Sequence, residues 1–159
     1  MKIRFYQIEC GDAACIMYDG IDGKPHFIFV DSGYERTFRD ILASEIKSIT
    51  SQGGQIDLWI VSHIHDDHIG GVVSYIKSIQ AEENRDIVLE WWYNPAFKVI
   101  SKLKDASAEI SEVKSFAQGE NVTSYLVKMG KLPKFDIVQG YPLVIVKCVS
   151  APYNIYKLH

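Results

Sequence analysis

The chain has 159 residues, of which 47% are hydrophobic and 23% charged, and its formal net charge is −3. This length supports one domain with a substantial core, and the small net charge gives no global attraction to nucleic acid or to an anionic membrane. The sequence contains no apolar run near the about 18 residues of a membrane-spanning helix, and the N-terminus lacks the apolar core of a secretory signal. We therefore expect no membrane partner.

The three cysteines are odd in number and irregular in spacing: Cys10, Cys15 and Cys148. They predict reduced, mostly buried thiols in a cytoplasmic protein rather than a disulfide framework; a cysteine-based metal site is an alternative to which the spacing gives little support.

The first third of the chain predicts a strand-rich opening. Alternating side chains indicate strands at about 2–9, 13–18 and 26–30, and the turn residues between them favour an antiparallel meander. Apolar residues at helical spacing then predict a helix over about 35–51, which Gly53-Gly54 ends. The apolar residues at 57–62 are typical of a buried strand.

The stretch from Ser62 to Gly71 is crowded with metal-type ligands, because it holds three of the five histidines and two aspartates. If strand geometry continues into the turn, His63 and His65 point the same way, so both imidazoles can grip one ion. Asp67 and His68 follow where the chain bends into a predicted helix over 68–80, and they can reach a second point nearby. Imidazole and carboxylate ligands suit zinc, manganese or iron better than calcium or magnesium.

The alternative to metal binding is that these residues have only a structural role. A single histidine in an apolar context usually packs, and an Asp-Asp pair is usually a solvated turn. Four ligand-type residues within six, between a buried strand and a Gly-Gly pair, are much harder to explain in that way.

The remainder of the chain predicts a further strand over 87–93, helices from Asn94-Pro95, over about 110–119 and over about 122–130, and a final strand at 143–149. The aromatic run at 91–93 could line a pocket, although we favour a core position for it. Strands mixed with helices fit an α/β sandwich with the sheet inside and the helices outside, in a single domain of residues 1–159.

The pattern His63-x-His65-x-Asp67-His68 resembles the motif of the metallo-β-lactamase superfamily of metal-dependent hydrolases, and Ile69-Gly70-Gly71 after it fits as well. The resemblance implies that His63 and His65 bind one metal ion and that Asp67 and His68 bind a second, with zinc expected and manganese or iron as alternatives. It also implies that a metal-bound hydroxide attacks an ester or phosphodiester bond and that Asp67 is catalytic, because it helps to hold that nucleophile.

Two shorter matches precede the histidines. The resemblance gives Asp31, at the end of the third strand, a supporting role in which it orients ligands by hydrogen bonding; simple turn capping is the alternative. Gly11-Asp12-Ala13-Ala14 and Val30-Asp31-Ser32-Gly33 together resemble the branch that includes the hydrolase domain of bacterial competence-type DNA-uptake proteins. That branch implies phosphodiester or nucleic-acid substrates, which the net charge does not support; the small-molecule substrates of other branches remain open.

The resembled family adds a third histidine, a bridging aspartate and a final histidine from later loops. After His68 the sequence offers only His159 as a histidine, and Asp86, Asp105 and Asp136 are poor bridging candidates, of which Asp136 is the best. The chain thus resembles mostly the N-terminal half of an αββα fold. We expect a truncated or naturally short relative with a weakened metal site.

Two further expectations follow from a half fold. It would leave an apolar sheet face open, which is costly, so we expect a second copy of the chain or the helices after residue 94 to cover that face. The alternative function is a catalytically incomplete metal-binding or structural domain that acts through a partner; a plain α/β binding module with an accidental motif is a third hypothesis.

Overall fold

The computed structural model describes residues 1–8, 11–93 and 110–131 of the chain. Its strands form one five-stranded sheet in the order β1-β2-β3-β4-β5, antiparallel from β1 to β3 and parallel from β3 to β5. The strands are β1 (Lys2–Phe5), β2 (Ala13–Asp19), β3 (Pro25–Asp31), β4 (Ile56–Val61) and β5 (Val88–Tyr93). The mixed α/β fold class that the sequence predicts is confirmed, and so is the opening meander.

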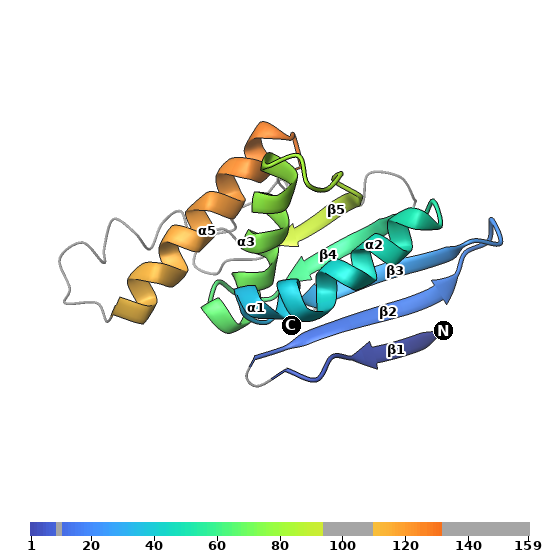
Figure 1. Cartoon of the computed structure of the whole chain (residues 1–159), viewed down its shortest axis with the longest axis horizontal. Coiled ribbons are helices and arrows are strands. Elements are labelled where there is room, and N and C mark those ends of the chain that lie inside the picture. Colours follow the sequence, from blue (N-terminus) through green and yellow to red (C-terminus); the bar gives the residue numbers. More distant parts are fainter. Residues whose placement is uncertain (9–10, 94–109, 132–159) are drawn as a thin grey trace, which may run out of the picture.

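All described helices lie against one face of this sheet, with α2 across β3 and β4, and α3 beside α5 (Figure 1). The helix predicted at 35–51 is one continuous segment whose middle turn widens into a π-helix. The helical segments are α1 (Glu35–Thr37), the π-helical turn η1 (Phe38–Leu42), α2 (Ala43–Ser51), α3 (Asp66–Gln80) and α5 (Ile110–Lys128). In the described part of the chain, no helix is both long and apolar enough to cross a bilayer.

The core between sheet and helices is built around a row of aromatic rings. Phe29, Trp59 and Trp91 occupy neighbouring positions on β3, β4 and β5, with ring centroids 5.2 and 5.3 Å apart. Tyr75 of α3 lies 5.2 Å from the Trp59 ring. Trp91 and Tyr93 are fully buried here, which confirms the core position favoured for these two rings, whereas Trp92 between them is only partly buried. Burial of these large rings fixes α3 over the sheet and therefore fixes where α3 begins.

The opposite face of the sheet is also apolar. One row across β2, β3 and β4 consists of Ile16, Ile28 and Leu58, and the next row contains Val30 and Ile60. None of the helices in the described ranges lies on this side. Parallel strands that are apolar on both faces are normally covered on both. The predicted covering of this face, by a second copy of the chain or by the helices after residue 94, therefore stays a prediction.

One predicted break in the chain is wrong. Helices were expected at about 110–119 and 122–130, whereas α5 runs without interruption through Gly119. This glycine does not end the helix; it allows a close approach, because a Cβ there would lie 3.1 Å from the Tyr93 hydroxyl. The same hydroxyl donates a hydrogen bond to the Gly119 carbonyl at 2.9 Å.

Two smaller outcomes complete the comparison. The first strand ends at Phe5 rather than at residue 9. The elements predicted over 94–109 and 132–159 lie outside the described residues. So do these individual residues: Cys10, Asp105, Asp136, Cys148 and His159.

Candidate metal centre

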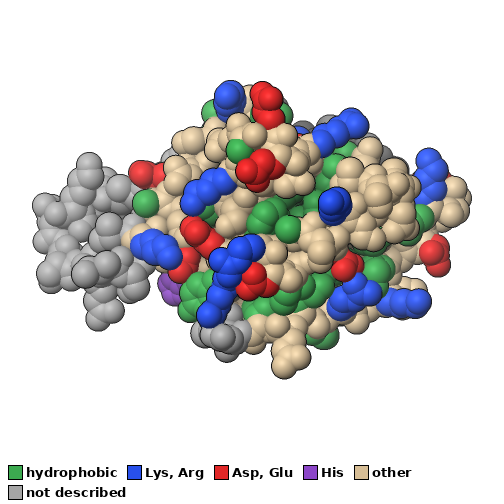
Figure 2. Space-filling view, viewed as in Figure 1, with side chains coloured by type: hydrophobic (Ala, Val, Ile, Leu, Met, Phe, Trp, Pro, Cys, Tyr) green, Lys and Arg blue, Asp and Glu red, His purple; other side chains and the backbone are tan. Residues whose placement is uncertain are grey.

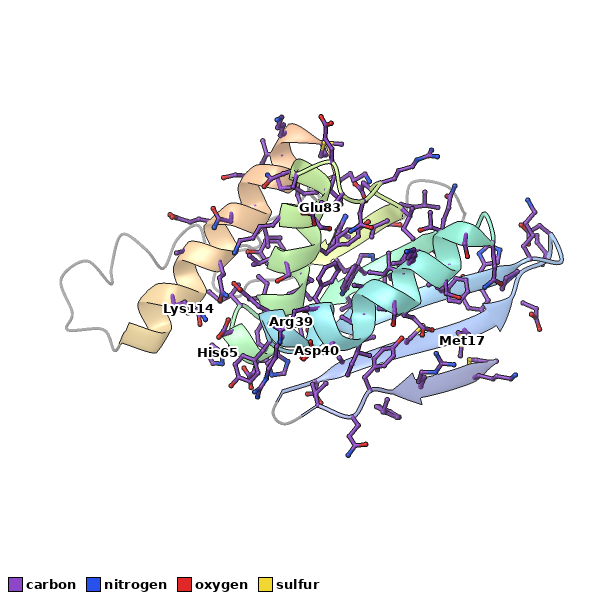
Figure 3. All side chains as sticks on the ribbon, viewed as in Figure 1. Met17, Arg39, Asp40, His65, Glu83 and Lys114 are labelled. Atoms are coloured by element: carbon purple, nitrogen blue, oxygen red, sulfur yellow. The ribbon has the colours of Figure 1, made fainter. Side chains whose placement is uncertain are left out.

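The predicted ligands lie at the carboxyl ends of the parallel strands, where β3 and β4 both end. Because these strands are parallel, their carboxyl ends meet there, which is where open α/β sheets usually bind ligands. Asp31 is the last residue of β3, Ser62 follows β4, and α3 starts at Asp66. Figure 3 shows His65 at this end of the molecule, below Lys114 of α5, and Figure 2 shows histidine reaching the surface there.

Two glycines of α3 explain why the turn can fold so tightly against the end of β3. A Cβ on Gly70 would lie 2.7 Å from the backbone nitrogen of Glu35, and one on Gly71 would lie 2.5 Å from the Ser32 carbonyl oxygen. The Gly71 N–H donates to the Gly33 carbonyl at 3.0 Å. Larger side chains would push the first turn of α3, and its ligands, away from β3.

A third glycine holds the turn before β2 against the same loop. Gly11 has φ +82°, and a Cβ there would overlap the backbone of Asp67. The Asp12 carbonyl accepts a hydrogen bond from Gly33 at 2.9 Å. The turns after β1 and β3 therefore pack against one side of the loop that carries the histidines.

Three imidazole rings gather at this edge. The ring centroids of His63 and His65 are 4.8 Å apart, and those of His63 and His68 are 3.8 Å apart. The Asp67 Oδ2 lies 3.7 Å from the Nε2 of His68. The side chains of His68 and Asp67 are 13% and 27% exposed, so they form the inner part of the group. The four predicted ligands are thus linked by pairwise contacts, with His63 and His65 exposed to solvent, and that they bind metal stays a prediction.

Asp31 accepts hydrogen bonds from two residues of this region, Ser62 and His68. Its Oδ1 accepts the Ser62 backbone N–H at 2.8 Å, and its Oδ2 accepts the Ser62 hydroxyl at 2.7 Å and the Nδ1–H of His68 at 3.0 Å. Asp31 is 3% exposed and has φ +53°, a left-handed conformation that aspartate and asparagine tolerate better than most residues. The contact to His68 is consistent with the supporting role, which stays a prediction.

The sequence analysis did not single out Asp12 as a site residue. In the described ranges, one group of three possible ligands has its atoms within 4.8 Å of one another: Asp12, Asp31 and His68. Asp31 accepts three hydrogen bonds, and Asp12 adds an exposed carboxylate beside His68. Register could have revealed this, because Ala13 pairs with Asp31 and so places Asp12 at the same edge.

The neighbouring Asp66 has a different role. Its Oδ2 accepts a hydrogen bond from Lys114 at 2.8 Å, and its Oδ1 accepts one from Gln118 at 2.6 Å. The hydrogen bond to Asp66 raises the pKa of Lys114. Asp66 therefore fastens α5 to the start of α3, and only the second aspartate of the pair faces the histidines.

The donor set fits a divalent transition metal. Burial lowers the pKa of His63, and the nearby rings of His68 and His65 lower it further, so the neutral form that binds metals is favoured. In His68, the Nδ1 is occupied by Asp31, and the remaining Nε2 lies toward Asp67. Imidazole nitrogens with a carboxylate oxygen match zinc, manganese and iron.

Comparison with known proteins identifies the family of the chain. No curated protein matches the chain. The family model described as the Metallo-beta-lactamase superfamily matches residues 14–104, which include the end of β3, the histidine loop and β5. The chain therefore belongs to the metallo-β-lactamase superfamily.

Proposed function

We propose that this protein is a metal-dependent hydrolase whose ligands are His63, His65, Asp67 and His68. The proposal depends chiefly on one observation: where β4 turns into α3, the ring of His63 neighbours those of His65 and His68, and His68 neighbours the Asp67 carboxylate. Membership in a superfamily of mostly metal-dependent hydrolases supports it. Zinc is the first candidate, manganese and iron are alternatives, and the site takes up to two ions.

Within the proposal each residue has a distinct task. A divalent ion supplies Lewis-acid chemistry, which polarises a substrate and makes water a nucleophile near neutral pH. His63 and His65 would hold one ion, and Asp67 and His68 would hold the second. Asp67 is also the residue that positions the attacking water, because its carboxylate is partly open to solvent. Asp31 keeps the His68 ring in place.

The bond that is cleaved belongs to an ester or a phosphodiester. The turn that carries Asp12, next to His68, is part of the resemblance to the competence-type branch and favours a phosphodiester. A long nucleic acid is less well supported: basic and acidic side chains are interspersed on the helical face (Figure 2), so that face has no continuous basic surface. A small phosphodiester is the better starting substrate.

The experiment combines metal analysis with turnover. Purified protein is saturated with zinc or manganese, dialysed and analysed for metal per chain, and it is then assayed with bis-p-nitrophenyl phosphate and p-nitrophenyl acetate. We expect about two ions per chain, as in two-metal hydrolases, and turnover that His65→Ala abolishes. Asp40→Asn, an exposed residue paired with Arg39, is the matched control and should leave both quantities unchanged. Protein that takes up no ion at saturating metal contradicts the proposal.

A second candidate is a catalytically incomplete metal-binding domain that acts through a partner. It is favoured because the proposed ligands come from one short segment, residues 63–68. The same experiment separates the two candidates. Bound metal that His65→Ala removes, without turnover of either probe, supports the incomplete domain.

A further inference from the structure

The buried carboxylate of Asp31 contacts His68 directly and is linked to His63 through the hydroxyl of Ser62. Asp31 Oδ2 accepts from the Nδ1 of His68 at 3.0 Å and from the hydroxyl of Ser62 at 2.7 Å. The same hydroxyl oxygen lies 2.9 Å from the Nδ1 of His63. We propose that Asp31, with Ser62 as a relay, sets the proton positions on both rings, so that His63 and His68 carry their proton on Nδ1 and present an unprotonated Nε2.

The direct contact determines the His68 tautomer. An ionised carboxylate only accepts hydrogen bonds, so the ring nitrogen facing Asp31 must carry the hydrogen. A neutral imidazole has one N–H and one lone pair, which leaves the lone pair of His68 on Nε2. That nitrogen is the one 3.7 Å from Asp67 Oδ2.

The relay to His63 depends on a single hydroxyl proton. Ser62 can give this proton either to Asp31 or to His63, but not to both. The contact to the carboxylate is shorter, and hydrogen bonds to ionised acceptors are about twice as strong as neutral ones. The hydroxyl therefore donates to Asp31 and accepts from His63, whose Nδ1 must carry the hydrogen and whose Nε2 keeps the lone pair.

His65 provides an internal reference. Within the described part of the chain, no hydrogen bond reaches its ring; its contact is the edge-on approach to His63. The relay therefore predicts a fixed tautomer for His63 and His68 and no fixed tautomer for His65.

The consequence for metal binding rests on the function proposed above, whereas the tautomers themselves are a property of the metal-free protein. A ring that presents an N–H to an ion must first change tautomer. Loss of such supporting hydrogen bonds commonly weakens metal binding about 10–100-fold. Ser62 is thus a positioning residue, and it acts through the His63 ring.

Ring nitrogen chemical shifts test the relay directly. Metal-free protein labelled with ¹⁵N, held with chelator at pH about 8.5 where an ordinary imidazole is neutral, gives long-range ¹H–¹⁵N correlations that distinguish N–H from bare nitrogen. We expect Nδ1–H in His63 and His68 of the wild type. In Ser62→Ala, His63 should lose this preference while His68 keeps it, and Ser62→Thr should restore it. Ser44→Ala, which removes an exposed hydroxyl bonded to Ile41, is the control.

Zinc titration of the same variants provides the second readout. We expect binding about 10-fold weaker in Ser62→Ala and near wild type in Ser62→Thr. The Ser62 backbone N–H still bonds Asp31 in both variants, so the loop keeps its anchor. Predominant Nε2–H in wild-type His63, or an unchanged His63 spectrum in Ser62→Ala, overturns the relay. Expected tautomers in a protein that binds no ion would instead overturn the metal function and leave the relay intact.

Discussion

The indole Nε1–H of Trp59 donates a hydrogen bond to the carbonyl oxygen of Asp31 at 3.1 Å, in the buried interior. Trp59 stacks on Trp91 with ring centroids 5.3 Å apart and an angle of 8° between the planes. Asp31, whose carboxylate contacts His68, is therefore also held by its backbone against the aromatic core. Because Asp31 has a left-handed φ, this anchor also helps to hold a conformation that few residues adopt.

The first prediction compares two buried tryptophans. Trp59→Phe leaves the Asp31 carbonyl without its buried donor, whereas the Nε1 of Trp91 has no hydrogen-bond partner in the described part of the chain. Both changes remove similar volume, so we expect Trp59→Phe to lower the free energy of unfolding by about 1–3 kcal/mol more than Trp91→Phe. Urea unfolding of the metal-free proteins measures the difference. Equal losses would mean that the hydrogen bond does not stabilise the fold.

The sequence predicted the scaffold of the site well, for a physical reason. Alternation, turn glycines and helical spacing are local properties, and they located the strands, α3 and the loop between them. The histidine loop was recognisable because four ligand-type residues lie within six positions after a strand, and Asp31 because it ends a strand and matches the family pattern. The contacts around them were less predictable, because Ser62 and Asp12 act across the sheet edge, through register and side-chain direction that no local pattern specifies.

The second prediction concerns the Gly-Gly pair in α3. Alanine favours a helix over glycine by about 1 kcal/mol, but a Cβ on Gly71 would lie 2.5 Å from the Ser32 carbonyl oxygen. Overpacking of this kind typically costs about 1–3 kcal/mol, so we expect Gly71→Ala to destabilise the protein and to weaken zinc binding. Ser74→Ala, a change to alanine further along α3, should be nearly neutral in thermal unfolding. A stabilised Gly71→Ala variant contradicts the tight packing.

The third prediction concerns pH and a histidine remote from the metal site. Nε2 of His26 lies 3.1 Å from Asp22 and its Nδ1 lies 2.8 Å from Asp57. Hydrogen bonds to Asp22 and then to Asp57 raise the pKa of His26. This contribution to stability is therefore complete below the unfolded pKa of about 6.5 and is lost as pH rises through the higher folded pKa.

The measurement is the difference in Tm between the wild type and His26→Gln from pH 5.5 to pH 9, with chelator present. We expect the wild type to be the more stable protein at the acid end and the difference to shrink toward the alkaline end. A difference that stays constant with pH would show that the two carboxylates do not act on a charged His26.

The fourth prediction tests whether the second sheet face is covered in solution. Ile28 lies in the centre of that face, beside Ile16 and Leu58. If a second copy or another part of the chain covers it, Ile28→Lys buries an unpaired charge and should lower the free energy of unfolding by more than about 2 kcal/mol. Ile21→Lys, at a fully exposed turn, is the matched control. Light scattering of both variants shows whether the covering surface is a second copy. If Ile28→Lys were tolerated as well as the control, the face would be open to water.

The fifth prediction concerns how the free energy of unfolding changes at acid pH. Burial alone would raise the pKa of Asp86, but hydrogen bonds from Lys131 and Tyr125 outweigh it and lower the pKa. These contacts, at 2.6 and 2.8 Å, hold the end of α5 against the start of β5. The stabilisation is therefore present above the unfolded pKa of about 3.9 and disappears as pH falls through the lower folded value.

We expect Asp86→Asn to destabilise the protein at pH 7 and to approach the wild type at strongly acid pH, because the wild type loses the same charge there. The other end of α5 stays attached to Asp66 through Lys114 and Gln118. Loss of the Asp86 contacts should therefore increase hydrogen exchange along α5 before it increases exchange in β4. Urea unfolding at several pH values and exchange measured by mass spectrometry check the two parts. A pH-independent loss would mean that Asp86 acts through its shape rather than its charge.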